Sequence, residues 1–159
     1  MQPPIKTYTI AEAQLKLENY CTYQDRCHWE VRQKLKNMRM IPQACDQIMI
    51  HLMQEDYLNE ERFARSFARG KFKVKKWGKL RITKELKARG ISKPNIDCAL
   101  TEINEVDYLE TFETLVDKRI GQLKAEKDKY KKRKKLADYL SYRGWPMHWI
   151  YERAKERIP

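Results

Sequence analysis

Leu86-Lys-Ala-Arg-Gly-Ile91 is one of three stretches of this sequence that align with one another without gaps. The other two are Leu35-Lys-Asn-Met-Arg-Met40 and Leu140-Ser-Tyr-Arg-Gly-Trp145. The match extends to apolar residues four positions before each stretch (Val31, Ile82, Leu136) and to residues ten positions after its start (Cys45, Ile96, Ile150). A recurring pattern of this kind is the mark of a repeat protein.

The spacing of the copies indicates the size of each repeat. Leu35 lies 51 residues before Leu86, and Leu86 lies 54 residues before Leu140. Three helices with their connections fill such a period. Amphipathic helices share leucine steps by chance, but Gly90 and Gly144 stand at the same offset and favour a true repeat.

Local signals place the helices. Thr9 and Glu12 have capping-box spacing and predict a helix to about Tyr23. A second helix should carry the apolar stripe Val31, Leu35 and Met38. Pro42 should open a third, with its stripe at Cys45, Ile48, Met49, Leu52 and Met53.

The later helices follow the same kinds of signal. Asn59 should cap a helix that Gly70 and the lysines after it end or fray, and Gly90 should follow the end of the next. Ser92 should cap another, and Asp107 and Glu110 should open the one after it, with its stripe at Leu109, Phe112, Val116 and Ile120. We therefore predict an all-α, elongated and curved array of three tandem three-helix repeats: 1–57 with the N-terminal lead, 58–104 in the centre, and 105–159.

Composition agrees with a folded helical chain. Hydrophobic residues make up 42% and charged residues 35%, with only five glycines and six prolines. The four cysteines, Cys21, Cys27, Cys45 and Cys98, fit no disulfide or zinc spacing and are expected to be structural. Without a signal peptide or an apolar run of membrane length, the sequence predicts a reducing cytoplasm as its location and no membrane contact.

The formal net charge of +12 implies an anionic partner. Between Arg69 and Lys93 there are eleven cations and one acid, Glu85, with Phe72 and Trp77 interleaved. This mixture suits phosphate contacts and base stacking, and it also suits an acidic protein surface. A second run, Lys127 to Lys135, is interrupted by Asp128, and it fits a binding surface and a solvated linker equally well.

No catalytic motif is present. The histidines His28, His51 and His148 are scattered, and phosphate-binding glycine loops and metalloprotease motifs are absent. A nuclease would need clustered metal-binding carboxylates, whereas the acids here lie mainly at helix starts or beside basic residues. Trp145 and Trp149 are expected to pack the last repeat. We therefore expect neither an enzyme nor a cofactor.

One long gapped motif resembles a known family. Tyr57-Leu-Asn-Glu-Glu-Arg-Phe-Ala-Arg-Ser-Phe-Ala-Arg-Gly-Lys71, followed by Trp77-Gly78, Arg81-Ile82, Glu85-Leu86 and Gly90-Ile91, resembles the central motif of RecX proteins. Arg26-Cys-His-Trp-Glu-Val-Arg-Gln-Lys-Leu35 is similar to the first repeat of that family. These proteins are bacterial regulators of the RecA recombinase.

The resemblance implies three three-helix repeats, no cofactor, and binding to RecA and its filament on single-stranded DNA. The effect would be modulation, mainly inhibition, of strand exchange, ATP hydrolysis and co-protease activity in DNA repair and the SOS response. We expect a monomer. The candidate RecA or DNA contacts are Arg62, Arg65, Arg69, Lys71, Lys73, Lys75, Lys76, Lys79, Arg81, Lys84, Lys87, Lys131, Lys132, Arg133, Lys134 and Lys135.

A second hypothesis is an autonomous helix-turn-helix DNA-binding protein. Leu86 to Ile96 reads as a helix, a glycine turn and a second helix, with Ser92 and Asn95 near the end that would face the groove. The same residues are also explained as a repeat junction, and the copies at Met40 and Trp145 lack comparable base-reading residues.

Overall fold

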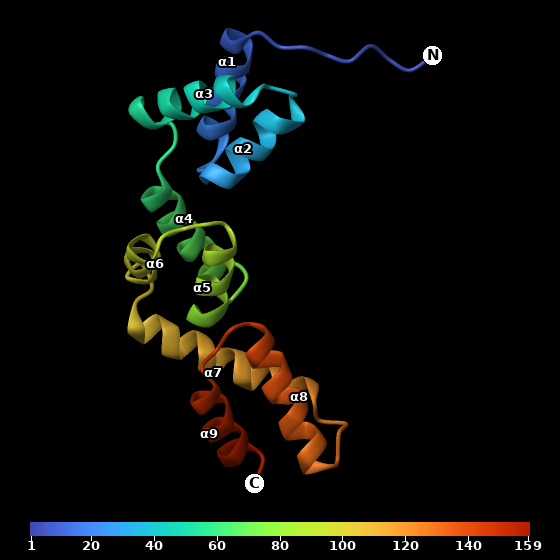
Figure 1. Cartoon of the computed structure of the whole chain (residues 1–159). Helices are drawn as coiled ribbons and strands as arrows, with labels where there is room; N and C mark the ends of the chain where they lie inside the picture. Colours follow the sequence, from blue (N-terminus) through green and yellow to red (C-terminus); the bar gives the residue numbers. More distant parts are fainter.

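Nine α-helices and no strand make up the structure, a computed structural model that describes residues 1–159 (Figure 1). The helices are α1 (Ile10–Tyr23), α2 (His28–Asn37), α3 (Pro42–Gln54), α4 (Glu60–Lys73), α5 (Lys79–Ala88), α6 (Lys93–Leu100), α7 (Glu105–Gln122), α8 (Lys129–Tyr142) and α9 (Met147–Arg157). They follow one another in groups of three along an elongated, arched chain (Figure 1). The predicted all-α repeat fold is confirmed. None of the helices is long and apolar enough to cross a bilayer.

The helix starts are set by local chemistry. At α1 the Thr9 side chain accepts from the Glu12 N–H at 3.1 Å, and Glu12 accepts from the Thr9 N–H, so the predicted capping box forms. Asn59 and Ser92 cap α4 and α6 in the same way, each accepting from an N–H three residues on. These caps satisfy amides that would otherwise lack partners.

Three local predictions need correction. The helix α4 ends at Lys73, within the lysine-rich stretch predicted to end it, but Gly70 itself lies inside the helix, and the buried Phe72 packs its last turn. The helix predicted to open at Asp107 begins at Glu105, where the Asn104 side chain accepts from two backbone amides. Leu109 is 44% exposed on that helix, and the neighbouring Tyr108 is buried in its place.

The α3 stripe is right at its centre and wrong at its edge. Ile48, Met49 and Leu52 are buried, whereas Met53 is exposed and Cys45 only half-buried. Cys45 nevertheless packs against the core of the first triplet, so Met53 is the residue that falls outside the predicted stripe.

The repeat is visible in the backbone itself. Arg39, Gly90 and Gly144 occupy the same offset in the three copies, and all three have positive φ, at 60°, 74° and 89°. In each copy the N–H of the residue after this position donates a hydrogen bond to the carbonyl of the aligned leucine. The pairs are Met40 to Leu35 at 3.1 Å, Ile91 to Leu86 at 3.1 Å and Trp145 to Leu140 at 3.2 Å. This is the bond that closes a helix in a Schellman motif, so the sequence alignment identifies one recurring structural unit.

Two hydrophobic cores run through the arch. Helices α1 to α3 enclose a core of ten buried residues, which includes Leu17, Leu35 and Leu52. Helices α4 to α9 share one continuous core of 22 buried residues. Cys27, which follows α1, is the only residue from the first triplet in that larger core, so the first triplet packs more independently than the other two.

The second and third triplets meet backbone to backbone. The Gly78 N–H donates to the Arg143 carbonyl at 2.8 Å, and the Leu80 N–H donates to the Gly144 carbonyl at 3.1 Å. A Cβ added to Gly78 would lie 2.3 Å from the Gly144 oxygen, and one added to Gly144 would lie 2.3 Å from the Arg81 nitrogen. Only glycine at both positions permits this approach, so Gly144 is required for its contact as well as for its turn.

Trp145 completes this junction. Its side chain is fully buried, stacks on Tyr108 with ring centroids 4.4 Å apart, and donates from Nε1 to the Lys76 carbonyl at 3.1 Å. The Tyr108 hydroxyl in turn accepts from the Lys79 N–H at 2.9 Å. The expectation that Trp145 packs the last repeat is correct, and its hydrogen bond also ties that repeat to the central one.

Candidate functional site

The three candidate arginines of α4 are held in ion pairs within the chain. Arg62 Nε lies 2.8 Å from Asp25 and its Nη1 lies 3.1 Å from Asp56, and the hydrogen bond to Asp25 raises the pKa of the guanidinium. These contacts join α4 to the first helix triplet. The Arg62 guanidinium is therefore neutralised by ion pairs within the chain.

Arg65 and Arg69 share one acid. Both lie within about 3 Å of the Glu102 carboxylate, at 3.0 and 3.2 Å, and Arg65 also pairs with Glu61. Hydrogen bonds from Arg65 and then Arg69 hold the pKa of Glu102 below its usual value. The positive charges of Arg65 and Arg69 are therefore largely balanced by Glu61 and Glu102. Counting cations along the sequence does not reveal this balance.

The candidates between Lys71 and Lys87 are different, because none has an acidic partner within ion-pair distance. They are Lys71, Lys73, Lys75, Lys76, Lys79, Arg81, Lys84 and Lys87. Five of these side chains are exposed, and the other three lie against aromatic rings. Glu85, the one acid among them in the sequence, pairs with Arg89 instead, at 3.0 Å. We call these eight residues the α4–α5 basic surface.

Aromatic rings and cations alternate along this surface. The Lys71 ammonium lies 5.4 Å from the Phe67 ring centre and 5.0 Å from that of Trp77. On the other side the Arg81 guanidinium lies 4.1 Å from Trp77 and 4.6 Å from Tyr142. All four distances are within the range of cation–π attraction. The row connects α4 through α5 to the end of α8.

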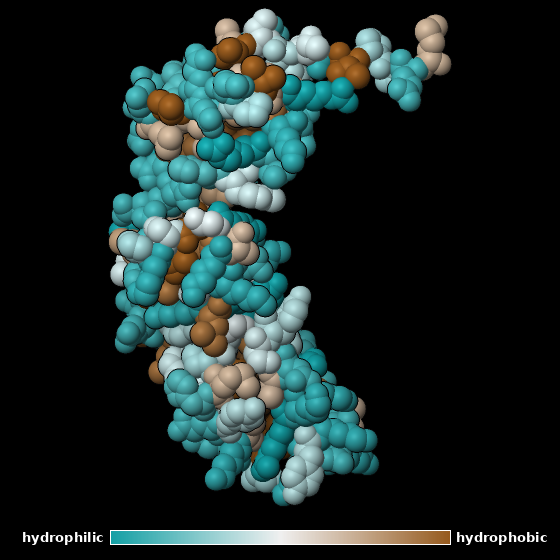
Figure 2. Space-filling model, viewed as in Figure 1, coloured by the Kyte–Doolittle hydropathy of each residue, from teal (hydrophilic) through white to brown (hydrophobic).

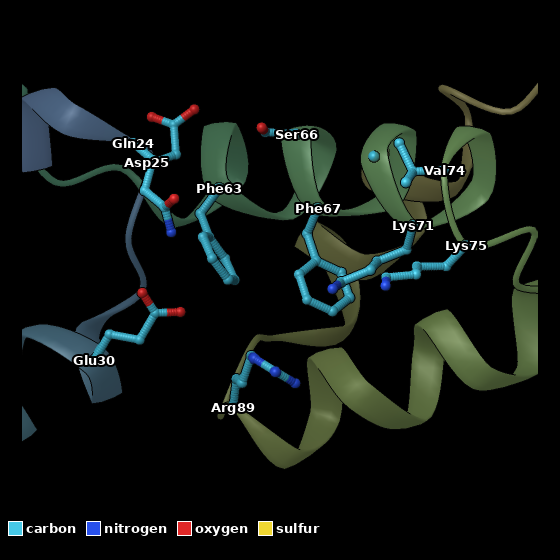
Figure 3. Close-up of a pocket in the computed structure, with 11 residues that line it drawn as sticks. Gln24, Asp25, Glu30, Phe63, Ser66, Phe67, Lys71, Val74, Lys75 and Arg89 are labelled. Carbon is cyan, nitrogen blue, oxygen red and sulfur yellow. The ribbon is translucent and has the colours of Figure 1, made fainter.

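A hollow of about 450 Å³ opens where the first triplet meets α4 and α5 (Figure 3). Phe63 and Phe67 form part of its wall, Lys71 extends into it from α4, and Arg89 extends into it from the end of α5 (Figure 3). Glu30 faces these groups from the first triplet, and burial raises the pKa of its carboxyl. The hollow is thus of mixed charge.

The second basic stretch is neutralised only in part. Lys134 pairs with Asp138 and Lys135 pairs with Glu126, at 2.9 and 2.8 Å. Arg133 donates to the Ile158 carbonyl and so anchors α9. Of the five candidates there, Lys131, Lys132 and Arg133 have no acidic partner within ion-pair distance.

The helix-turn-helix hypothesis depends on α6, which is poorly suited to reading bases. The helix has eight residues, Ile96 and Ala99 are buried, and its exposed Asp97 pairs with Lys93. The Ser92 oxygen is occupied by the cap. An acid on the outward face opposes close approach to phosphate.

Hydrophilic side chains cover most of the face seen in Figure 2, and hydrophobic ones appear as narrow strips and patches, the largest near the N-terminal end. No group of three or more His, Cys, Asp or Glu side chains is placed to hold a metal ion. Two residues beside the basic surface are not among the sequence candidates. Arg89 lies over Phe67 at 4.8 Å, and Tyr142 is brought to Arg81 from 61 positions away. The only sequence signal for Tyr142 is an aromatic residue at a helix end.

Comparisons with known proteins agree with this architecture. Residues 59–100 match the family model described as RecX, second three-helix domain, and residues 105–152 match RecX, third three-helix domain. The crystal structure of RecX from Lactobacillus salivarius superposes with a TM-score of 0.76 at 22% identity, covering 94% of this chain and 96% of that one. A second crystal structure, of regulatory protein RecX, gives a TM-score of 0.77 over 92% of this chain and 73% of the other.

Curated relatives carry the same name, regulatory protein RecX. The Pseudomonas savastanoi pv. phaseolicola protein is 30% identical over 122 residues, which is 76% of each chain. The Lactobacillus johnsonii and Clostridium acetobutylicum proteins are 28% and 29% identical over 74% and 80% of this chain. The matched part is 45% and 60% of those two longer proteins. The two domain matches and the Pseudomonas relative show that the chain belongs to the RecX family of regulatory proteins.

Proposed function

We propose that this chain binds RecA and the RecA filament on single-stranded DNA, and that it modulates, mainly by inhibition, the recombinase, ATPase and co-protease activities. The α4–α5 basic surface supports this most directly. Eight cations without acidic partners repel one another, and the repulsion is relieved when an anionic partner is bound. A RecA–DNA filament would offer both acidic protein and phosphate.

The three triplets, 1–57, 58–104 and 105–159, are proposed as the modules of this regulator. A monomer acting in the cytoplasm is part of the same proposal, since RecA would be its partner there. In this arrangement the second module presents the cations and the other two extend the contact along the filament.

The direct test is RecA-driven ATP hydrolysis on single-stranded DNA. Purified protein added at amounts near or below those of a cognate RecA should slow hydrolysis. If it has no effect at any ratio, the proposal is wrong.

A charge-reversal variant tests the surface. We expect Lys71→Glu, Lys73→Glu, Lys75→Glu and Lys76→Glu together to weaken filament binding while leaving helicity unchanged, because these side chains lie at the outer end of α4 and in the loop after it. The matched control reverses four exposed lysines of the first triplet: Lys6, Lys16, Lys34 and Lys36. It makes the same change in total charge. Equal loss in both variants would indicate a non-specific charge effect, and no loss in the first would move the interface elsewhere.

A further inference from the structure

A second hollow, of about 350 Å³, lies between α5 and the end of α8, where the second and third triplets join. Its walls are Leu80, Arg81, Lys84 and Glu85 of α5 and Ser141 and Tyr142 of α8. Its size falls in the range of small-ligand pockets. We call it the α5–α8 groove.

Tyr142 presents a flat aromatic surface at this groove. Its residue exposure is 70%, so the ring is not part of the core. Arg81 covers one face of the ring, with the guanidinium carbon 4.6 Å from its centre. Because a guanidinium occupies only one side, the opposite face is open to a planar ligand.

Arg81 also fixes that ring in place. Its guanidinium lies against Trp77 at 4.1 Å, and its Nη1 donates to the Tyr142 carbonyl at 3.3 Å. The backbone on either side is held by the close contact of Gly78 with Gly144. The platform therefore exists before a ligand arrives, which lowers the entropic cost of binding. Bridging two triplets explains the position of Arg81, but it does not explain an open tyrosine face beside unpaired cations.

The charges at the groove favour an anion. Neither Arg81 nor Lys84 has an acidic partner, and Glu85 is paired with Arg89 at 3.0 Å. Lys87 lies one turn further along α5, exposed and also without an acidic partner. An exposed aromatic ring beside unpaired cations matches a polymer of planar bases and phosphates. An acidic protein surface would use the cations alone.

We propose that the α5–α8 groove is a single-stranded nucleic-acid site, in which a base stacks on the open face of Tyr142 and Arg81 and Lys84 neutralise the adjoining phosphates. The inference rests on the proposed function, because it names how that regulator would touch DNA directly. Recognition of this kind is independent of base sequence, since every base has a π face.

The experiment measures binding without RecA. Fluorescence anisotropy compares a labelled oligo-dT with an abasic deoxyribose-phosphate strand of equal phosphate number, at one fixed salt concentration. Tyr142→Ala should weaken oligo-dT binding at least about fivefold, the lower end of the loss expected for one stacking platform. It should leave abasic binding unchanged. Tyr142→Phe, which keeps the ring, should bind as the original protein does.

Tyr151→Ala is the matched control, because Tyr151 is similarly exposed (62%) in the same triplet and lies on a different helix, away from the groove. It should bind both strands normally. Lys84→Gln should weaken both strands equally, because it removes a phosphate contact.

Several results would overturn the site. The first is equal affinity of the original protein for the two strands, and the second is unchanged oligo-dT binding by Tyr142→Ala. The third is that polyglutamate binds as tightly as oligo-dT and that Tyr142→Ala weakens both equally. A parallel RecA ATPase assay separates the two proposals. If the protein inhibits RecA but Tyr142→Ala does not weaken oligo-dT binding, the proposed function holds and the groove proposal is wrong. If Tyr142→Ala weakens oligo-dT binding but the protein has no effect on RecA, the groove proposal holds and the proposed function is wrong.

Discussion

Replacing Gly78 by alanine should strongly destabilise the join between the second and third triplets. The new Cβ would lie 2.3 Å from the Gly144 oxygen, 2.6 Å from its carbonyl carbon and 2.8 Å from the Trp145 nitrogen. All three are backbone atoms, so no side chain can rotate away. The two triplets must separate locally to accept the methyl group.

The size of the effect follows from two contributions. Forcing extra volume into a tight contact costs about 1–3 kcal/mol. Separation also stretches the hydrogen bonds from Gly78 to Arg143 and from Leu80 to Gly144, each of which contributes about 1 kcal/mol net. We expect a total loss of about 3–5 kcal/mol in the free energy of unfolding.

Urea unfolding followed by far-ultraviolet circular dichroism measures this loss. Gly70→Ala is the matched control, because Gly70 lies inside α4 and its new methyl group would meet no atom beyond its own helix within 4 Å. It should raise stability by about 0.5–1 kcal/mol, since alanine is the better helix former. A Gly78→Ala protein within about 0.5 kcal/mol of the original would refute the reasoning.

Three further predictions concern the rest of the chain. Arg62→Ala should lower the free energy of unfolding by about 1 kcal/mol, because it leaves Asp25 and Asp56 without their partner. Arg32→Ala breaks one exposed ion pair and should change the free energy of unfolding by less than about 0.5 kcal/mol in the same urea titration. Burial raises the pKa of Tyr108 to about 12 from 10.0, so its stabilising contribution is complete below pH 10 and is lost between pH 10 and about 12. Between these pH values the free energy of unfolding should fall by about 1.4 kcal/mol per pH unit because of Tyr108, and it should fall less steeply in Tyr108→Phe, as measured by urea unfolding at several pH values. Identical slopes in the two proteins would contradict this prediction. Finally, burial raises the pKa of the Cys21 thiol to about 11 and also raises that of Cys27, so Cys45 and Cys98 should be alkylated first at neutral pH, as read by peptide mass spectrometry.

The features that can be predicted from the sequence are mainly those that depend on near neighbours. The caps at Thr9, Asn59 and Ser92 involve atoms three residues apart, and the sequence predicts all three. Gly70 resembles a helix end because its local propensity is weak, but the burial of Phe72 outweighs it. Tyr108 is not evident as a core residue because its hydroxyl finds a partner, the Lys79 N–H, 29 positions away.

The basic surface shows the same division. Cation density between Arg69 and Lys93 is evident from the sequence, but which cations remain unpaired is not. Arg62 and Arg65 are neutralised by Asp25 and Glu102, each 37 positions distant, so no short window of sequence contains both members of either pair. The position of Tyr142 beside Arg81 likewise depends on the packing of two triplets.

The two junctions of the arch differ in mechanical character. Backbone atoms of Gly78 and Gly144 are in direct contact, and the second and third triplets share one hydrophobic core, so we expect them to behave as one rigid unit. The first triplet is joined to it by the linker after α3, by the Cys27 side chain and by polar side chains such as Arg62 with Asp25 and His28 with Glu60. Because polar side-chain contacts hold two bodies less firmly than a shared core does, we expect this joint to be the more flexible of the two. A partner surface longer or shorter than the arch should then be matched by rotation of the first triplet, while the spacing between the central and C-terminal triplets stays constant.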